Sequence, residues 1–315
     1  MSTSTSPSAP PPDRWWFRPV PLARIAVFRA IAYLFVPVDV FLTTAWVKAH
    51  ADVPVEWYDP LLIGRLLDLP TPTHTVVVVV QWSLVLAALA AATGRAPRLL
   101  GTAVFLLYME WMVIAMSYGK VDHDRIAYLV ALAVLPTIGR ARFRDRRPSE
   151  AAGWAMAAVL VTIMLTYFFA AWAKIRFGGL DWPTGATLTR ALVRRGTDLS
   201  EWTLDVPYLL ATAQWVMLIL EFAAPLMLLV RSDRARIALA VFLLGFHVMV
   251  YAGVQIIFLP HCVAILSILP WERLTARRRA PTEPSVPEVS PARACCADPA
   301  HGRRQSRPSS SSAAR

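Results

Sequence analysis

Cysteine, charged residues and metal-binding patterns are all scarce in this sequence of 315 residues. The three cysteines, Cys262, Cys295 and Cys296, form no CxxC pair and no metal-spaced set with histidine. The number and spacing of these cysteines exclude a disulfide framework, and we expect no metal site. Only 17% of the residues are charged, which excludes the usual composition of a soluble domain.

Apolar residues are abundant instead. They make up 56% of the chain, and its mean hydropathy is +0.47, which indicates a membrane protein whose main partner is the lipid bilayer. The net charge of +11 does not indicate a nucleic-acid-binding protein, because the basic residues form short clusters between apolar runs rather than one amphipathic face.

The apolar runs predict an all-α fold, a polytopic transmembrane bundle of about eight helices. A helix needs roughly 20 mostly apolar residues to cross the hydrocarbon core. Two windows, 125–139 and 260–271, are shorter and have the length of half-spans. The windows of sufficient length lie at about 22–46, 75–93, 98–117, 151–173, 206–230 and 235–257.

The loops between these windows predict the topology, because cytoplasmic loops collect Lys and Arg. Counting both short windows places "GRAPR", "GRARFRDRR", "RSDRAR" and "WERLTARRR" on one side. Omitting either window would move an arginine-rich loop to the other side. We therefore expect a multi-pass protein of the cell membrane with both termini cytoplasmic. The outer loop 174–205 should contain a short interfacial helix after Pro183 that ends at Gly196.

Composition divides the chain into three segments. Residues 1–19 are rich in Ser and Pro and lack the apolar core of a removable signal peptide, so we expect a disordered cytoplasmic N-terminus. Residues 20–272 form the transmembrane domain. Residues 273–315 are rich in Pro, Ser, Ala and Arg, which predicts a disordered cytoplasmic tail. No internal repeat is evident, so the inverted-repeat pattern of many transporters is missing.

Ionisable residues inside the apolar windows are the first candidates for function. Arg29 and Asp39 lie in the window 22–46, Glu110 in the window 98–117 and Glu221 in the window 206–230. Each central charge costs about 2.5–3.5 kcal/mol if it faces lipid, so these four should form buried charge pairs. Arg29 paired with Glu110 or Asp39 is the simplest arrangement, and both a structural and a functional role are open.

Two further patterns follow helical spacing. His247, Tyr251 and Gln255 stand at i, i+4 and i+8 and predict a polar stripe that lines a cavity in the outer half of their helix. Gln214 and Glu221 share a face at i, i+7. Interhelical hydrogen bonding is the alternative interpretation for these polar residues.

Lys174 closes the span 151–173. Tyr167, Ala171 and Lys174 fall on one helical face, beside small residues that let a neighbouring helix approach. A lysine at a helix end commonly extends to the headgroups. Held in a dry pocket, it would instead be a usable general base. In a nearby outer loop His123 stands between Asp122 and Asp124, whose carboxylates favour a charged imidazole.

Four stretches together resemble the HTTM family, whose best-characterised relative is the membrane region of vitamin K-dependent gamma-carboxylase. They are "PLARIAVFRAIAYLF", "YGKVDHDRIAYLVAL", "YFFAAWAKIRFGGLDWPTGATLTRAL" and "FHVMVYAGVQIIFLPHCVAILSILPW". The resemblance covers roughly residues 20–272. Its most specific motif is Tyr-Phe-x-Ala-x-x-x-Lys followed by Asp-Trp-x-x-Gly, here residues 167–174 and 181–185.

The resemblance implies catalytic roles for Lys174, His123 and His247. In the carboxylase the corresponding lysine is regarded as the base that activates reduced vitamin K. The implied site opens to the outer face, with a reduced quinone as the candidate cofactor and a quinone or lipid-like molecule as the candidate ligand. Ala173 stands where the carboxylase has a second lysine, and we expect no large outer domain for a protein substrate.

Three functions are compatible with these features. A membrane enzyme predicts that Lys174, His123 and His247 converge on one pocket with polar and aromatic walls. A non-catalytic accessory protein predicts that every buried charge is a packing pair. A transporter predicts that the intramembrane charges mark a pathway. The pocket residues expected for the enzyme are Tyr167, Trp172, Trp182, Tyr251 and Gln255.

Overall fold

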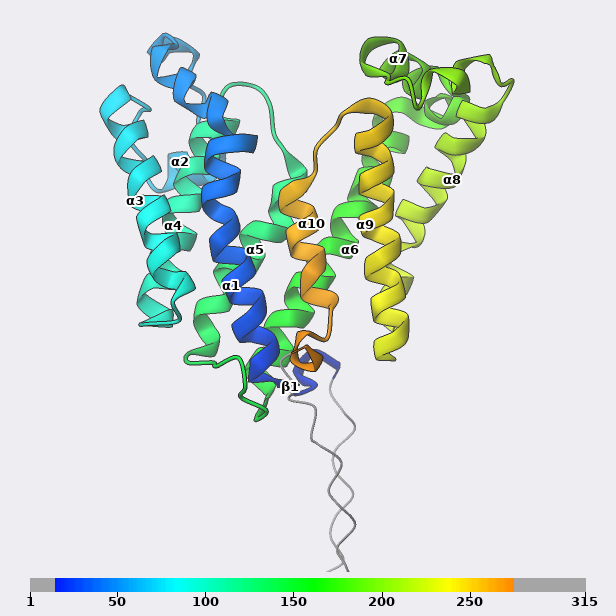
Figure 1. Ribbon diagram of the computed structural model, residues 1–315. Helices are drawn as coiled ribbons and strands as arrows, with labels where there is room; N and C mark the ends of the chain where they lie inside the picture. The colour runs from blue at the N-terminus through cyan, green and yellow to red at the C-terminus, as the bar shows by residue number, and fades with distance from the viewer. Residues whose placement is uncertain (1–14, 275–315) are drawn as a thin grey trace, which may run out of the picture. The chain divides into compact units, whose positions relative to one another are not determined.

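The computed structural model describes residues 15–274, which are mostly helical (Figure 1). Two strands of two residues each, β1 (Val20–Pro21) and β2 (Pro148–Ser149), pair in antiparallel orientation. The helices are α1 (Leu22–Val38), α2 (Leu62–Leu66), α3 (His74–Ala92), α4 (Pro97–Met116), α5 (Ile126–Val134), α6 (Glu150–Gly178), α7 (Ala186–Arg195), α8 (Leu209–Ala223), α9 (Asp233–Val254) and α10 (Leu259–Ile265).

Six helical segments within residues 15–274 are long and apolar enough to cross a membrane. They are Leu22–Thr43, His74–Ala92, Pro97–Met116, Glu150–Thr184, Leu209–Leu229 and Asp233–Val254. The two short windows are also helical: α5 continues as a 3-10 turn to Ile138, and α10 continues to Ile268. The all-α, polytopic fold is therefore confirmed.

The starts of three long helices follow from their sequences. Thr73, Ser149 and Ser232 precede α3, α6 and α9, and each side-chain oxygen accepts a hydrogen bond from the backbone N–H three residues later. Such N-caps satisfy donors that have no partner within the helix. The interfacial helix expected within residues 183–196 is α7, which ends at Arg195 before Gly196.

The connections divide between the two ends of the bundle. Loops 93–96, 139–149 and 230–232 share one end with residues 15–21, and we call this the arginine-rich end. Segments 44–73, 117–125, 179–208 and 255–258 lie at the opposite end, where Figure 1 shows α7. The alternation of helices thus agrees with the loop assignment that the charge pattern predicted.

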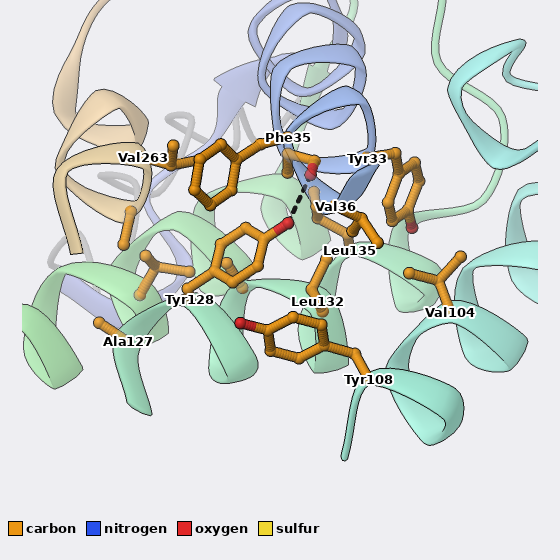
Figure 2. Packing of buried hydrophobic residues seen from close by; sticks show 14 of the residues in the cluster. Tyr33, Phe35, Val36, Val104, Tyr108, Ala127, Tyr128, Leu132, Leu135 and Val263 are labelled. Carbon is orange, nitrogen blue, oxygen red and sulfur yellow. Dashed lines mark hydrogen bonds between the residues drawn. The ribbon is translucent and has the colours of Figure 1, made fainter. Parts of the chain in front are cut away.

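The interior is built around α6, which packs against α5, α8 and α10, while α3 packs against both α1 and α4 on the other side of α5. Figure 2 shows the core between α1, α4 and α5. The Tyr128 ring packs edge-on against Phe35 and Tyr108, with ring centroids 5.4 and 5.2 Å apart. Its hydroxyl donates a 2.6 Å hydrogen bond to the Ala32 carbonyl, so the buried phenol is satisfied.

The two segments expected to be disordered lie mostly outside the described residues. The described part of the N-terminal segment contains a 3-10 turn, Trp15–Phe17, that packs on α6. A Cβ added at Gly153 of α6 would lie 2.0 Å from the Arg18 carbonyl oxygen. Only a glycine therefore lets the chain before α1 cross α6 this closely.

Candidate functional site

Lys174 lies in the last turns of α6, and its side chain contacts α8. Its Nζ is 2.6 Å from Glu221 Oε1 on α8, and the other carboxylate oxygen also accepts a hydrogen bond. The same ammonium lies 4.9 Å from the centroid of the Trp182 ring, within the range of a cation–π contact. The lysine is thus held by an anion and an aromatic face.

The turn after α6 positions the Trp182 ring. A Cβ at Gly178 would lie 3.0 Å from the Trp182 side chain, so the absence of one lets the indole fold back over the helix end. The Gln214 amide of α8 fixes this turn from the other side. It donates to the Trp182 carbonyl at 2.8 Å and accepts from the Leu188 N–H at 3.3 Å. Gln214 therefore has the interhelical hydrogen-bonding role that the sequence left open.

A second cluster lies two turns earlier on α6. The Tyr167 hydroxyl and His247 Nε2 of α9 are 2.7 Å apart. His261 of α10, only 2% exposed, completes the cluster with its ring centroid 5.0 Å from that of Tyr167 and 5.4 Å from that of His247. His247 Nδ1 has no hydrogen-bond partner among residues 15–274. Because Tyr167 and Lys174 are seven residues apart on one helix face, both clusters face the same side of α6.

His123 lies in the 3-10 turn His123–Arg125 that precedes α5. The side chain is exposed, at the same end of the bundle as the C-terminal end of α6. Asp122 does not pair with this imidazole, since its carboxylate contacts Lys120 at 3.0 Å and Arg125 at 4.0 Å. For Asp124 burial is the largest effect and raises the pKa of its carboxyl.

The expected stripe of His247, Tyr251 and Gln255 is not a single interior face. His247 is buried, but Tyr251 is 54% exposed. Gln255 lies beyond the end of α9 in a left-handed conformation (φ 54°) and is also exposed. A spacing of four residues advances 400° around a helix, so the second and third members rotate away from the first. Trp172 likewise points outward and forms no wall of the site.

The expected pairing of Arg29 with Asp39 or Glu110 is wrong. Arg29 donates to the carbonyls of Gly139 and Leu135, both at 2.9 Å, and so caps the C-terminal end of the α5 segment. These carbonyls are the acceptors that a helix end leaves without partners. The Glu110 carboxylate has no hydrogen-bond partner among the described residues.

Asp39 is paired with Arg125, a residue that the sequence analysis did not single out. Arg125 Nη1 is 2.7 and 2.8 Å from the two carboxylate oxygens, and the Tyr108 hydroxyl donates to the same carboxylate at 2.9 Å. Thr43 also donates to it. This network joins the end of α1 to the start of α5 and therefore fixes the position of the turn that contains His123.

A crevice of about 30 Å³ lies between α6, α8 and α9, and one residue of each cluster, Glu221 and Tyr167, lines it. Tyr167 and Glu221 supply its polar atoms, and the rest of the lining is apolar. It is lined by Tyr167, Met217, Leu220, Glu221, Ala224, Met227, Phe242, Leu243 and Phe246. Among residues 15–274 no group of three or more His, Cys, Asp or Glu side chains could hold a metal ion. The arrangement can exchange protons with a largely apolar ligand.

Comparison with known proteins identifies a family. The family model described as HTTM domain matches residues 17–271, which is most of the chain and includes every residue of the two clusters. No curated protein and no solved structure matches the sequence. Together with the membrane-spanning helices, this match identifies the chain as an integral membrane protein that belongs to the HTTM family.

Proposed function

We propose that this chain is a membrane enzyme of the vitamin K-dependent gamma-carboxylase-like type, with Lys174 as its general base and a reduced quinone or other lipid-like molecule as its substrate. The observation that carries the proposal is the 2.6 Å contact of Lys174 Nζ with Glu221 inside the bundle. A headgroup anchor would extend outward instead.

Glu221 gives the lysine a route to the neutral amine. In the resting pair the two side chains share one proton, and its transfer to the carboxylate leaves Lys174 with a free electron pair. Desolvation of the pair by a bound apolar ligand favours this neutral form over two buried charges. The amine then takes the proton of a substrate hydroxyl, and the substrate becomes an anion beside the ammonium. Trp182 stabilises the ammonium through its ring face.

The histidines supply a path for the proton that the lysine receives. His123 is exposed at the end of the bundle where α6 ends, and we assign it the transfer of this proton to solvent. His247 and Tyr167, joined by their 2.7 Å hydrogen bond, place a second donor and acceptor beside the crevice, where they orient a substrate oxygen.

The lining of the crevice supports a lipid-like substrate. Apolar side chains of α8 and α9 form most of its wall, and large apolar side chains such as Ile219 and Val241 are exposed on the outer surfaces of the same helices. A ligand dissolved in the bilayer therefore meets an apolar entrance. Its ring needs more room than about 30 Å³, so binding requires α8 to move away from α9.

The test is turnover of a reduced quinone by the purified protein in lipid nanodiscs, with oxygen as the oxidant and the oxidised quinone measured by absorbance. Lys174→Ala should lower kcat by about 100-fold or more, the usual effect of a general base. Arg176→Ala is the matched control, because this neighbouring cation is exposed. Equal turnover by wild type and Lys174→Ala would remove the lysine from the mechanism.

A structural clamp is the competing role for the same pair, since Lys174 and Glu221 join α6 to α8. This role fits a non-catalytic accessory protein. The double variant Lys174→Met, Glu221→Leu separates the two, because apolar replacement of a buried pair is often neutral for stability. If the pair is only a clamp, the double variant should match the wild type in stability and in turnover. If the pair is catalytic, the double variant should be stable but without turnover.

We also propose that the arginine-rich end faces the cytoplasm of a cell carrying the protein in its cell membrane. The loop 139–147 contains five arginines, which supports this orientation. With the native cysteines replaced by serine, Arg142→Cys should resist a membrane-impermeant thiol reagent applied to intact cells. Val121→Cys, exposed in the loop at the opposite end, should react with it. The reverse labelling pattern would show that the arginine-rich end faces outward and would contradict the proposed orientation.

A further inference from the structure

A cavity of about 230 Å³ lies at the arginine-rich end, at the opposite end of α6 from Lys174. Its walls come from residues 15–24, the first turns of α6 and α9, and the turn at Ser267–Ile268. One water molecule needs about 10–15 Å³ of such space, so the cavity has room for a polyatomic group. Nothing in the proposed reaction uses it.

Three arginines line the cavity, and within residues 15–274 only Arg24 among them forms an ion pair. Arg24 forms a buried, bidentate pair with Glu272 at 2.6 and 2.9 Å. The carboxylate of Asp233, also in the lining, pairs with Arg273. Within residues 15–274 neither Arg18 nor Arg236 forms an ion pair. The charges of Arg18 and Arg24 act on Arg236 against those of Asp233 and Glu272. With three arginines and one carboxylate in its lining, the cavity carries a net positive charge.

Two buried donors in the cavity also lack partners. Ser267 is only 3% exposed, and its Oγ has no hydrogen-bond partner in the described part of the chain. Arg236 Nε is buried and equally without a partner. Buried donors are normally satisfied in a folded protein. A bound anion with several acceptor oxygens would satisfy both and offset the repulsion among the arginines.

We propose that this cavity binds a phosphate group, supplied by the headgroup of an anionic phospholipid. Arg18 and Arg236 contact the phosphate oxygens, since guanidinium groups match phosphate in geometry and charge, and Ser267 Oγ donates to the same group. The apolar part of the lining, Met156, Leu160 and Ile268, accommodates the glycerol end of the acyl chains. The site does not depend on the proposed enzymatic function, because no residue is shared with it.

The test measures lipid retention by native mass spectrometry of the delipidated protein, titrated with phosphatidylglycerol or phosphatidylcholine. Phosphatidylglycerol should bind preferentially, and its affinity should fall about tenfold in Arg236→Gln and in Arg18→Gln, the effect of losing one charge-assisted hydrogen bond. Arg234→Gln is the matched control. It removes an exposed arginine from the same turn of α9 that does not line the cavity.

Melting temperatures with inorganic phosphate alone distinguish the two sources of the group. If inorganic phosphate raises the melting temperature and Arg18→Gln abolishes this effect, the anion site also accepts free phosphate. If only phosphatidylglycerol raises the melting temperature, the ligand is the lipid. The proposal is overturned if neither compound stabilises the protein, if phosphatidylcholine binds equally well, or if Arg234→Gln weakens binding as much as Arg236→Gln. Arg18 is exposed, so its variant tests the site even if Arg236→Gln fails to fold.

Discussion

Replacing Arg125 by methionine should strongly destabilise the bundle. The change removes the cation from Asp39, whose side chain is 0% exposed, and keeps an apolar side chain of similar length. The carboxylate then stays buried with donors from Tyr108 and Thr43 only. Breaking a buried pair from one side costs about 3–5 kcal/mol. The two remaining donors place the expected loss near the lower limit, about 3 kcal/mol.

The double variant Asp39→Leu, Arg125→Met supplies the internal control. Removing both charges leaves no uncompensated ion, so the double variant should be more stable than Arg125→Met alone. Tyr108→Phe, which removes a single hydrogen bond to the carboxylate, should cost about 1.5–3 kcal/mol.

The free energy of unfolding is measured by denaturant titration of the protein in mixed micelles, with helix content as the signal. A loss below about 1 kcal/mol in Arg125→Met would refute the reasoning, because no buried carboxylate could lose its cation so cheaply. Additive losses in the double variant would also refute it, since they would mean that the two side chains are not coupled.

Two further predictions concern packing and pH. Gly153→Ala should lower the free energy of unfolding by about 1–3 kcal/mol, because its Cβ would meet the Arg18 backbone; Gly245→Ala, with no neighbour within 4 Å, should raise it by up to about 1 kcal/mol. Burial lowers the pKa of His50 from 6.5, so the unfolded state binds more protons below that pH and stability should fall there. The decrease should be smaller in His50→Gln; equal slopes in the two proteins would contradict the assignment.

Hydropathy and loop charge were sufficient for the fold. The long windows coincide with helices because a span must satisfy all its backbone groups internally and cover about 30 Å. The two short windows depended on charge, since their length alone is compatible with other structures. Composition did not predict the packing of the turn Trp15–Phe17 on α6, because this long-range contact is not contained in the local sequence.

The sequence was sufficient to predict individual residues of the candidate site but not which of them pair with one another. Lys174 and Glu221 both stood out as charges near apolar segments, yet they are 47 residues apart and periodicity gives only the face of each helix. Arg125 was missed because it lies at a helix start, where a charge costs little if exposed. His261 was missed within a short window, although a histidine between two apolar runs was a usable signal.

The pair between Arg24 and Glu272 has a consequence for the order in which the protein is made. The two residues are 248 positions apart and join the start of α1 to the last described turn. Chains are synthesised at about 5–20 residues per second, so roughly 12–50 s separate the two ends of this contact. During that interval the first span inserts without its final partner. The fraction of chains that fold correctly therefore depends on Arg24 staying near the membrane surface until Glu272 has been synthesised.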